Sequence, residues 1–281
     1  MQAKEIVTAI KAFPGMPGTA LKLLALIDDP AMRVSQIESI LRHDPGLTAN
    51  VLILANSAYF GIPSKVGSIR QAVILLGLKR LIQMVIAACV SAIMDKPVPG
   101  YDLSPGELWR HSIAVSVAAE GLVKELKIEA AEEIFTAALL HDVGKLVLGQ
   151  FVKNDLTKIQ AAVSQGISFD MAETIVLGIN HAEVGARILT KWALPLEIIN
   201  AIKFHHAPQN AGHTSTMLDI VHVANSMTMM IGTGIGGRDG INHKASAEAT
   251  ERLGLKAVHL ERVAGQTMQW VNELTGVFGS H

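Results

Sequence analysis

The chain has 281 residues, of which 49% are hydrophobic and 17% are charged, so it can build one large domain or two closely packed subdomains. This balance excludes an intrinsically disordered chain, which needs low hydrophobicity and a high net charge. A formal net charge of −1 and an aromatic content of 4% exclude a basic, aromatic-lined surface for nucleic acid.

The sequence predicts a cytoplasmic protein that does not enter a membrane. Cys89 is the single cysteine, which excludes an intrachain disulfide and fits a reducing compartment. The N-terminal residues lack the basic and apolar regions of a signal peptide. The most apolar run, Leu81 to Met94, has about fourteen residues, whereas a membrane span needs about 20.

Apolar residues recur with helical spacing along almost the whole chain. Residues that favour helix starts precede several of these segments: Ser35 with Glu38, Asp44 with Pro45, Ser68 with Gln71, and Ser104 with Pro105. No segment alternates apolar and polar residues over the length of a strand. The fold class is therefore predicted to be all-α.

The segment from Asp95 to Gly106 holds three prolines and two glycines and is the predicted boundary between two helical halves. We expect an N-terminal subdomain over residues 1–98 and a second one over residues 104–281. A second loop, Thr233 to His243, is rich in glycine. It lacks the GK[ST] ending and the preceding strand of a phosphate-binding loop, so we expect a surface loop there.

Polar side chains with metal-binding or proton-transfer chemistry collect in the second half. Five predicted helices each contribute at least one such residue within apolar sequence: His111, His141, Asp142, His181, His205, His206 and Asn225. Taken singly, each is more often a hydrogen-bonded core residue than a ligand. Burying an unpaired ionisable group costs several kcal/mol, so the set as a whole is expected to converge or to hold a metal.

Imidazole and carboxylate ligands suit a divalent transition metal such as iron, manganese, nickel or zinc. Such a metal lowers the pKa of a bound water and polarises a phosphoryl oxygen. Lys145 lies one helical turn after His141 and Asp142, where its charge would offset that of a phosphate. The alternative is that Lys145, His141 and Asp142 form a buried ion-pair network without metal.

Four segments of the chain resemble the HDOD family, whose name stands for HD-related output domain. They are FPGMPGTALKLLALIDDP from residue 13, HDPGLTANVLILANSAYFGIPSKVGSIRQAVILLGL from residue 43, LLHDVGKLVLGQF from residue 139, and HAEVGARILTKWALPLEIINAIKFHHAP from residue 181. The resemblance covers about residues 13–230 and leaves further helices at the C-terminus. It implies a bacterial protein with a multihelical HD-superfamily bundle and an N-terminal helical subdomain.

The resemblance also implies roles for the polar residues. In the wider HD superfamily of metal-dependent phosphohydrolases, one metal is held by a His, a His-Asp doublet and a late Asp. His111, His141 and Asp142 match the first three positions, and Asn225 stands where the late carboxylate is expected. In the di-metal HD-GYP branch, further histidines hold a second metal, and His181, His205 and His206 match them.

Two departures from the pattern bear on activity. The amide of Asn225 carries no negative charge, so the ligand set around His111 lacks one carboxylate. The Gly-Tyr-Pro signature of HD-GYP enzymes is also absent, because the chain reads HHAPQNAGHT after the His pair, from residue 205. Cyclic di-GMP hydrolysis is therefore not expected.

The leading interpretation is a signalling or regulatory protein with a degenerate metal site, acting through protein partners. The alternative is a phosphohydrolase that cleaves a phosphoester or nucleotide through metal-bound hydroxide, with Asp142 and Lys145 as catalytic residues. A phosphorylated small molecule is then an expected ligand, and nucleic acid is not. The apolar helix around Leu81 to Met94 is compatible with a homodimer face as well as with an intrachain core.

Overall fold

The computed structural model describes residues 2–24, 26, 32–129, 133–233 and 245–278. These residues form helices connected by turns, with no strand among them beyond an isolated bridge between Val98 and Leu103. The all-α prediction is confirmed. Most of the glycine-rich loop predicted from Thr233 to His243 lies outside the described residues.

Contacts between Cα atoms divide the chain into two compact units. Unit 1 comprises residues 1–14 and 94–269, and unit 2 comprises residues 15–93 and 270–281. The division after residue 93 falls close to the predicted boundary segment, but the first 14 residues belong with the second half of the chain. The reason is local, because α1 (Gln2–Ala12) packs against α9 and α12 of unit 1.

Hydrogen bonds connect the end of α1 and the residues after it with the end of α12. The Lys191 ammonium donates to the carbonyl oxygens of Lys11 and Phe13, at 2.8 and 2.6 Å. The Trp192 indole N–H donates to the carbonyl oxygen of Pro14 at 3.0 Å. These contacts join residues about 180 positions apart, so no local sequence pattern could have predicted them.

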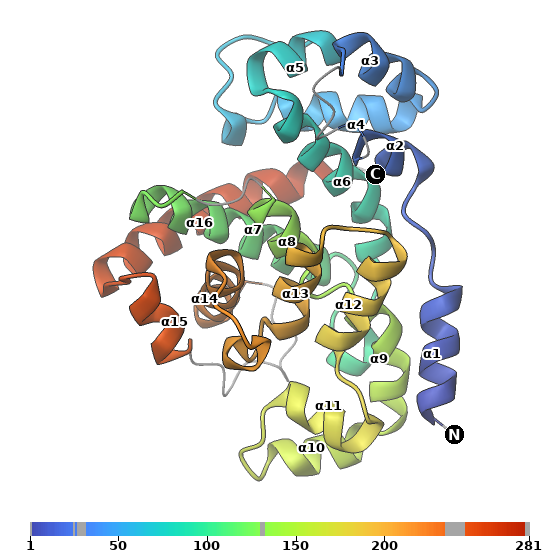
Figure 1. The fold of residues 1–281 in the computed structure, drawn as a ribbon, viewed down its shortest axis with the longest axis vertical. Coiled ribbons are helices and arrows are strands. Elements are labelled where there is room, and N and C mark those ends of the chain that lie inside the picture. Colours follow the sequence, from blue (N-terminus) through green and yellow to red (C-terminus); the bar gives the residue numbers. More distant parts are fainter. Residues whose placement is uncertain (1, 25, 27–31, 130–132, 234–244, 279–281) are drawn as a thin grey trace. The chain divides into compact units, whose positions relative to one another are not determined.

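Unit 1 is built around α7 (Glu107–Leu126), α8 (Ile134–Leu140) and α14 (Thr216–Met230), which pack against one another. Every residue of α14 from Met217 to Met229 is buried, so this helix is the centre of the core. The surrounding elements are η2 (Pro99–Tyr101), α9 (Lys145–Asn154), α10 (Leu156–Val163), α11 (Phe169–Leu177), α12 (His181–Lys191), α13 (Leu196–Phe204), η3 (Pro208–Ala211), α15 (Ala247–Arg252) and most of α16 (Ala257–Phe278) (Figure 1).

Unit 2 is a smaller helical unit. Its α3 (Val34–Arg42) packs against α2 (Gly18–Leu24), α4 (Pro45–Ala55) and α5 (Ile69–Leu76). A 3-10 turn, η1 (Ala58–Phe60), follows α4, and all but the last residue of α6 (Leu78–Met94) also belongs to this unit. The end of α16 completes it.

The predicted helix starts are right where the capping side chain is close to the apolar run. Asp44 and Ser68 each accept a hydrogen bond from the backbone N–H three residues on. Two predictions are wrong. Helix α3 begins two residues earlier than a cap at Ser35 requires, because Arg33 is its N-cap and the Gln36 side chain accepts from the Arg33 backbone N–H. Helix α7 begins at Glu107 and not at Pro105. Gly106, between them, has φ = 81°, which is outside the right-handed helical range.

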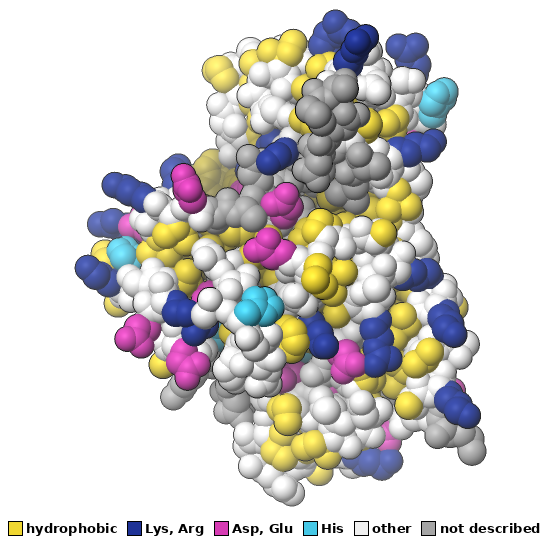
Figure 2. Space-filling view, viewed as in Figure 1, with side chains coloured by type: hydrophobic (Ala, Val, Ile, Leu, Met, Phe, Trp, Pro, Cys, Tyr) yellow, Lys and Arg dark blue, Asp and Glu magenta, His cyan; other side chains and the backbone are white. Residues whose placement is uncertain are grey.

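Charged side chains of both signs are interspersed over the face seen in Figure 2. This distribution agrees with the formal net charge of −1.

Candidate metal centre

The predicted metal ligands come from separate elements of unit 1. His111 lies on the second turn of α7, and Asn225 lies on α14. The His141–Asp142 doublet occupies the turn between α8 and α9, so both side chains follow directly from a buried helix end. His181 is the first residue of α12, and the remaining two histidines, His205 and His206, follow the end of α13.

The side chain of Asp142 lies between two groups of histidines. Its Oδ2 is 3.6 Å from His111 Nε2 and 3.3 Å from His141 Nε2. Its Oδ1 is 3.3 Å from His181 Nε2 and 3.8 Å from His205 Nε2. Each carboxylate oxygen therefore faces a different pair of imidazoles, so Asp142 could serve as a ligand together with either pair.

Potential ligand atoms lie within 4.8 Å of one another in each of two groups, and Asp142 is common to both. The first group, which we call the four-ligand site, contains Asp142, His181, His205 and His206. The second, which we call the three-ligand site, contains His111, His141 and Asp142. The sequence-predicted ligands therefore converge, apart from Asn225, which contacts the three-ligand site through His111.

Hydrogen bonds set the tautomer of four histidines. Each of these imidazoles has its Nδ1 close to an oxygen that can only accept, so Nδ1 carries the hydrogen and, in a neutral ring, leaves a lone pair on Nε2. The acceptors are Thr233 O for His111 (3.1 Å), Ala138 O for His141 (2.7 Å), Glu173 Oε2 for His181 (2.8 Å) and Ile202 O for His205 (2.6 Å). Ligand histidines in metalloproteins are oriented by this kind of outer hydrogen bond.

Nε2 of His141 and Nε2 of His205 face the centre without a hydrogen-bond partner within the described part of the chain. The carboxylate oxygens of Asp142 have ion-pair contacts, to the Lys145 ammonium at 2.9 Å and to imidazoles at 3.3 to 3.8 Å. Buried polar atoms without a partner are rare in folded proteins, and a bound ion is one of the established reasons for them. The donor set and its orientation therefore fit a divalent transition metal.

Nearby charge raises the pKa of one histidine in the four-ligand site, and burial lowers the pKa of another. Burial lowers the pKa of His181, but the charge of Glu173 and hydrogen bonds to Asp142 and Glu173 outweigh burial and raise that pKa to about 10. Burial, aided by the nearby His141, holds the pKa of His205 well below its usual value. Without metal, His181 is thus an imidazolium whose Nε2 lies 2.8 Å from His206 Nε2, and His205 is neutral.

The Asp142 carboxyl is ionised. Burial alone would raise its pKa, but the charges of His141 and Lys145, together with the close imidazoles of His141 and His181, hold that pKa well below the usual value. The Lys145 ammonium lies 2.9 Å from Asp142 Oδ2 and 5.2 Å from the centre of the Tyr101 ring. Lys145 is itself buried, so its charge is directed at the centre and away from solvent.

Asn225 and His111 form an unusual pair. Asn225 Oδ1 lies 3.0 Å from His111 Nε2, and burial, together with the charge of His141, lowers the pKa of His111 to about 4. Because His111 is neutral and donates through Nδ1, two lone-pair atoms face each other. A cation shared between them would relieve this contact, and so would a rotated amide that donates through Nδ2.

Two residues of the centre were missed by the sequence analysis. The Glu173 side chain, on α11, is fully buried and accepts hydrogen bonds from the Nδ1 and backbone N–H of His181, both at 2.8 Å. It also accepts from the hydroxyl of Tyr101, at 2.5 Å. The available signal was a carboxylate in the largely apolar run FDMAETIVL, eight residues before His181, although Asp170 in the same run weakens it.

Replacing Glu173 with glutamine is expected to weaken metal binding about 10- to 100-fold, because a neutral amide would not supply the charge that makes His181 a stronger ligand. Competition with a chromophoric chelator measures the affinity. Glu183→Gln is the control, since it neutralises a half-exposed carboxylate on the same helix as His181. Equal affinities for the Glu173→Gln protein and the wild type would remove Glu173 from the ligand environment.

His222 lies near the centre without belonging to it. Its Nδ1–H donates to the carbonyl oxygen of His205 at 2.6 Å, and its Nε2 accepts from the backbone N–H of Ser246 at 2.8 Å. Both ring nitrogens are therefore engaged by backbone. His222 connects the end of α13 with the start of α15 and is a structural residue.

One stretch among the described residues, 134–154, has the length and composition of a membrane span. It consists of α8, the turn with His141 and Asp142, and α9, and 78% of its most apolar window is buried inside this protein. Packing within unit 1 accounts for that composition, since α8 contacts α7, α13 and α14.

Comparison with known proteins agrees with this architecture. Over 97% of its length the chain resembles a crystal structure from Shewanella amazonensis SB2B, described as a candidate phosphohydrolase, with 27% identity, 96% of that chain covered and a TM-score of 0.73. A protein of unknown function from Geobacter sulfurreducens shares the fold over 99% of the chain and 96% of its own length, with 23% identity and a TM-score of 0.77; it is described as an HDOD domain protein.

A curated relative, an uncharacterized protein of Treponema pallidum (strain Nichols), is 29% identical over 208 residues. The match covers 73% of this chain but only 39% of that protein, so the chain spans about two fifths of the relative's length. The sequence model of the HDOD domain matches residues 13–208, which is more than half of the chain. The protein therefore belongs to the HDOD family.

Proposed function

We propose that this HDOD protein is a bacterial signalling or regulatory protein of the cytoplasm, whose centre binds a divalent metal without efficient hydrolysis. The observation that carries the proposal is the amide of Asn225 beside His111, where a carboxylate would complete the three-ligand site. An amide oxygen can ligate but brings no charge and little basicity. The four-ligand site keeps its carboxylate and three imidazoles and is the one we expect to be filled.

Enclosure of the centre supports the same proposal. His111, His141, Asp142, Lys145, His181, His205 and Asn225 are all buried, with relative exposures between 0 and 5%. Among the described ligand candidates, His206 alone is half-buried. A bulky phosphoester would have to reach the metal past this one edge, whereas a metal ion needs only a transient opening.

The second candidate function is phosphoester or nucleotide hydrolysis. It is favoured by Lys145, whose ammonium is held beside Asp142, and by the relative described as a candidate phosphohydrolase. A bound divalent metal would supply Lewis acidity toward a phosphoryl oxygen and lower the pKa of water. The chain itself would contribute Lys145, to stabilise phosphate charge, and Asp142, as an anionic ligand of the metal.

Metal analysis combined with hydrolysis assays separates the two functions. Purified protein is expected to contain iron, manganese, nickel or zinc, and to show no turnover of a generic phosphodiester or phosphomonoester with added metal. Turnover that is lost in the Asp142→Ala protein would establish the hydrolase function and overturn the regulatory proposal. A fully folded protein that binds none of these metals would contradict both.

Asn225→Asp is expected to complete the three-ligand site and to raise the metal content toward two ions per chain. The added carboxylate supplies the charge that the amide lacks, beside His111. Metal content after dialysis, measured by mass spectrometry, checks this, with Asn210→Asp in the exposed η3 turn as the control. An unchanged metal content in folded Asn225→Asp protein would show that this position does not limit the second site.

A further inference from the structure

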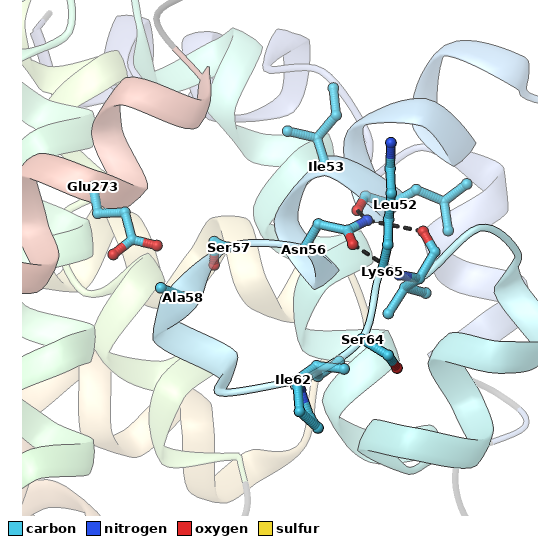
Figure 3. Close-up of a pocket in the computed structure, with 11 residues that line it drawn as sticks. Leu52, Ile53, Asn56, Ser57, Ala58, Ile62, Ser64, Lys65 and Glu273 are labelled. Atoms are coloured by element: carbon cyan, nitrogen blue, oxygen red, sulfur yellow. Dashed lines mark hydrogen bonds between the residues drawn. The ribbon is translucent and has the colours of Figure 1, made fainter.

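Unit 2 contains a pocket of about 810 Å³ at the end of α4. It is lined by the loop of the motif NSAYFGIPSKV, residues 56–66, and by the part of α16 that belongs to this unit (Figure 3). Leu52, Ile53 and Ile62 supply apolar surface, and Ser57, Lys65 and Glu273 supply polar groups. No residue of this motif belongs to the candidate metal centre.

The wall of the pocket is held in place by Asn56. Its Nδ2 donates to the carbonyl oxygens of Leu52 and Val66, at 2.7 and 2.8 Å, and its Oδ1 accepts from the backbone N–H of Val66 at 2.8 Å. One side chain thereby closes the loop onto its own start (Figure 3). A loop that is ordered before binding loses less conformational entropy when a ligand arrives.

Aromatic side chains stiffen the same loop. The Arg80 guanidinium lies over the rings of Phe60 and Tyr59, 4.9 and 5.7 Å from their centres. The Tyr59 ring meets Trp270 of α16 edge to face, with 5.7 Å between ring centres. Ring packing therefore connects the loop with the part of α16 in this unit.

Two polar groups of the pocket, Glu273 and Ser57, make few hydrogen bonds to other described residues. Glu273 Oε1 accepts one long bond from the Tyr59 backbone N–H, at 3.3 Å. The Ser57 hydroxyl is buried in the pocket wall and has no hydrogen-bond partner within the described residues. In Figure 3 the Glu273 carboxylate points toward the turn at Ser57 and Ala58, and Lys65 extends beside Leu52 on the other side of the loop.

The apolar part of the pocket is open to solvent, since the Ile53 side chain on its rim is 47% exposed. A compact metabolite bound at Ser57 would leave the apolar surface around Ile53 exposed to solvent. An extended chain that continues along the rim would cover it, and the carboxylate at one side and the ammonium at the other favour a chain with charges of both signs.

From this arrangement we infer that the pocket binds a short peptide segment of a partner protein, in which apolar residues stand between a basic and an acidic residue. The basic residue pairs with Glu273, the acidic residue pairs with Lys65, and the apolar residues cover Ile53 and Ile62. This inference names the partner class of the proposed regulatory role. It is tested by binding alone, so its failure leaves the metal measurements unaffected.

The test is a titration of this 281-residue chain, labelled at isoleucine methyl groups, with the peptide Ac-Arg-Leu-Leu-Glu-NH2. The methyl signals of Ile53 and Ile62 are expected to shift, and that of Ile37, buried in α3 of the same unit, is expected to stay in place. Neutralising one charge, by Glu273→Gln or Lys65→Gln, should weaken binding about threefold to fivefold, as expected for partly exposed ion pairs. The matched control is Lys22→Gln, which removes an exposed charge in α2 outside the pocket.

Three results would overturn the inference. The first is the absence of any Ile53 or Ile62 shift at millimolar peptide. The second is equal binding of the neutral peptide Ac-Gln-Leu-Leu-Gln-NH2, which would show that the charges play no part. The third is a shift of these signals with protein concentration alone, which would identify a second copy of the chain as the occupant.

Discussion

Replacing Asp142 with alanine is expected to remove the metal from the four-ligand site and to leave neither ligand group able to hold one. Its two carboxylate oxygens face different histidine groups, and among the described residues it is the side chain that belongs to both ligand groups. Loss of an anionic ligand should lower metal affinity by more than the 10- to 100-fold that is typical for an outer hydrogen-bond partner. Metal content per chain is expected to fall to background.

The same substitution also affects the protein without metal. The Lys145 ammonium lies 2.9 Å from Asp142 and is buried, so Asp142→Ala leaves a buried charge without its carboxylate. Removing one partner of a buried ion pair typically costs about 3–5 kcal/mol. The double variant Asp142→Ala with Lys145→Met removes both charges, and it is expected to recover most of that stability while remaining free of metal.

Urea unfolding and metal analysis on the same preparations distinguish the two effects. Asp155→Asn, which neutralises a carboxylate at the start of α10 outside the centre, is expected to keep the metal content of the wild type. If the folded double variant still retained stoichiometric metal, Asp142 would not be a ligand. The centre would then be the buried ion-pair network that the sequence left open as an alternative.

Replacing Gly144 with alanine is expected to destabilise the protein by more than about 3 kcal/mol, because the added methyl group has no room. A Cβ at this position would lie 1.9 Å from the carbonyl oxygen of His181 and 2.6 Å from the backbone nitrogen of Gly185. Both obstacles are backbone atoms of α12, so the helices themselves would have to separate. Gly144 has φ = −64°, an ordinary helical value, so backbone conformation is not the reason for glycine here.

Separation of α9 from α12 would also displace side chains of the candidate metal centre. Gly144 lies two residues after Asp142, and its closest neighbour would be His181 itself. We therefore expect Gly144→Ala protein, if it folds, to bind metal more weakly. Gly265→Ala in α16 is the control, since its Cβ would meet no atom within 4 Å and should be neutral or stabilising by about 0.5–1 kcal/mol. An unfolding midpoint of the Gly144→Ala protein equal to that of the wild type would contradict the close approach of α9 and α12.

Local patterns in the sequence were sufficient where the relevant interactions are themselves local. Helical periodicity predicted the all-α class, and short-range capping predicted the starts of α4 and α5 at Asp44 and Ser68. The same reasoning failed at α7. Gly106 has a left-handed backbone conformation, so the helix begins at Glu107 and does not include Pro105. Glu173 was missed for a different reason, since its partners Tyr101 and His181 lie on other elements.

The sequence by itself thus determined that the chain is helical, that it resembles the HDOD family, and which side chains are candidates for a metal centre. Residue type and spacing carry this information, because burial of polar groups within apolar helices requires partners. Only the tertiary structure decided that Asp142 faces both histidine groups, that Lys145 pairs with Asp142, and that the first 14 residues pack with unit 1. These relations join residues far apart in the chain, and packing of whole helices, absent from any local pattern, sets their distances.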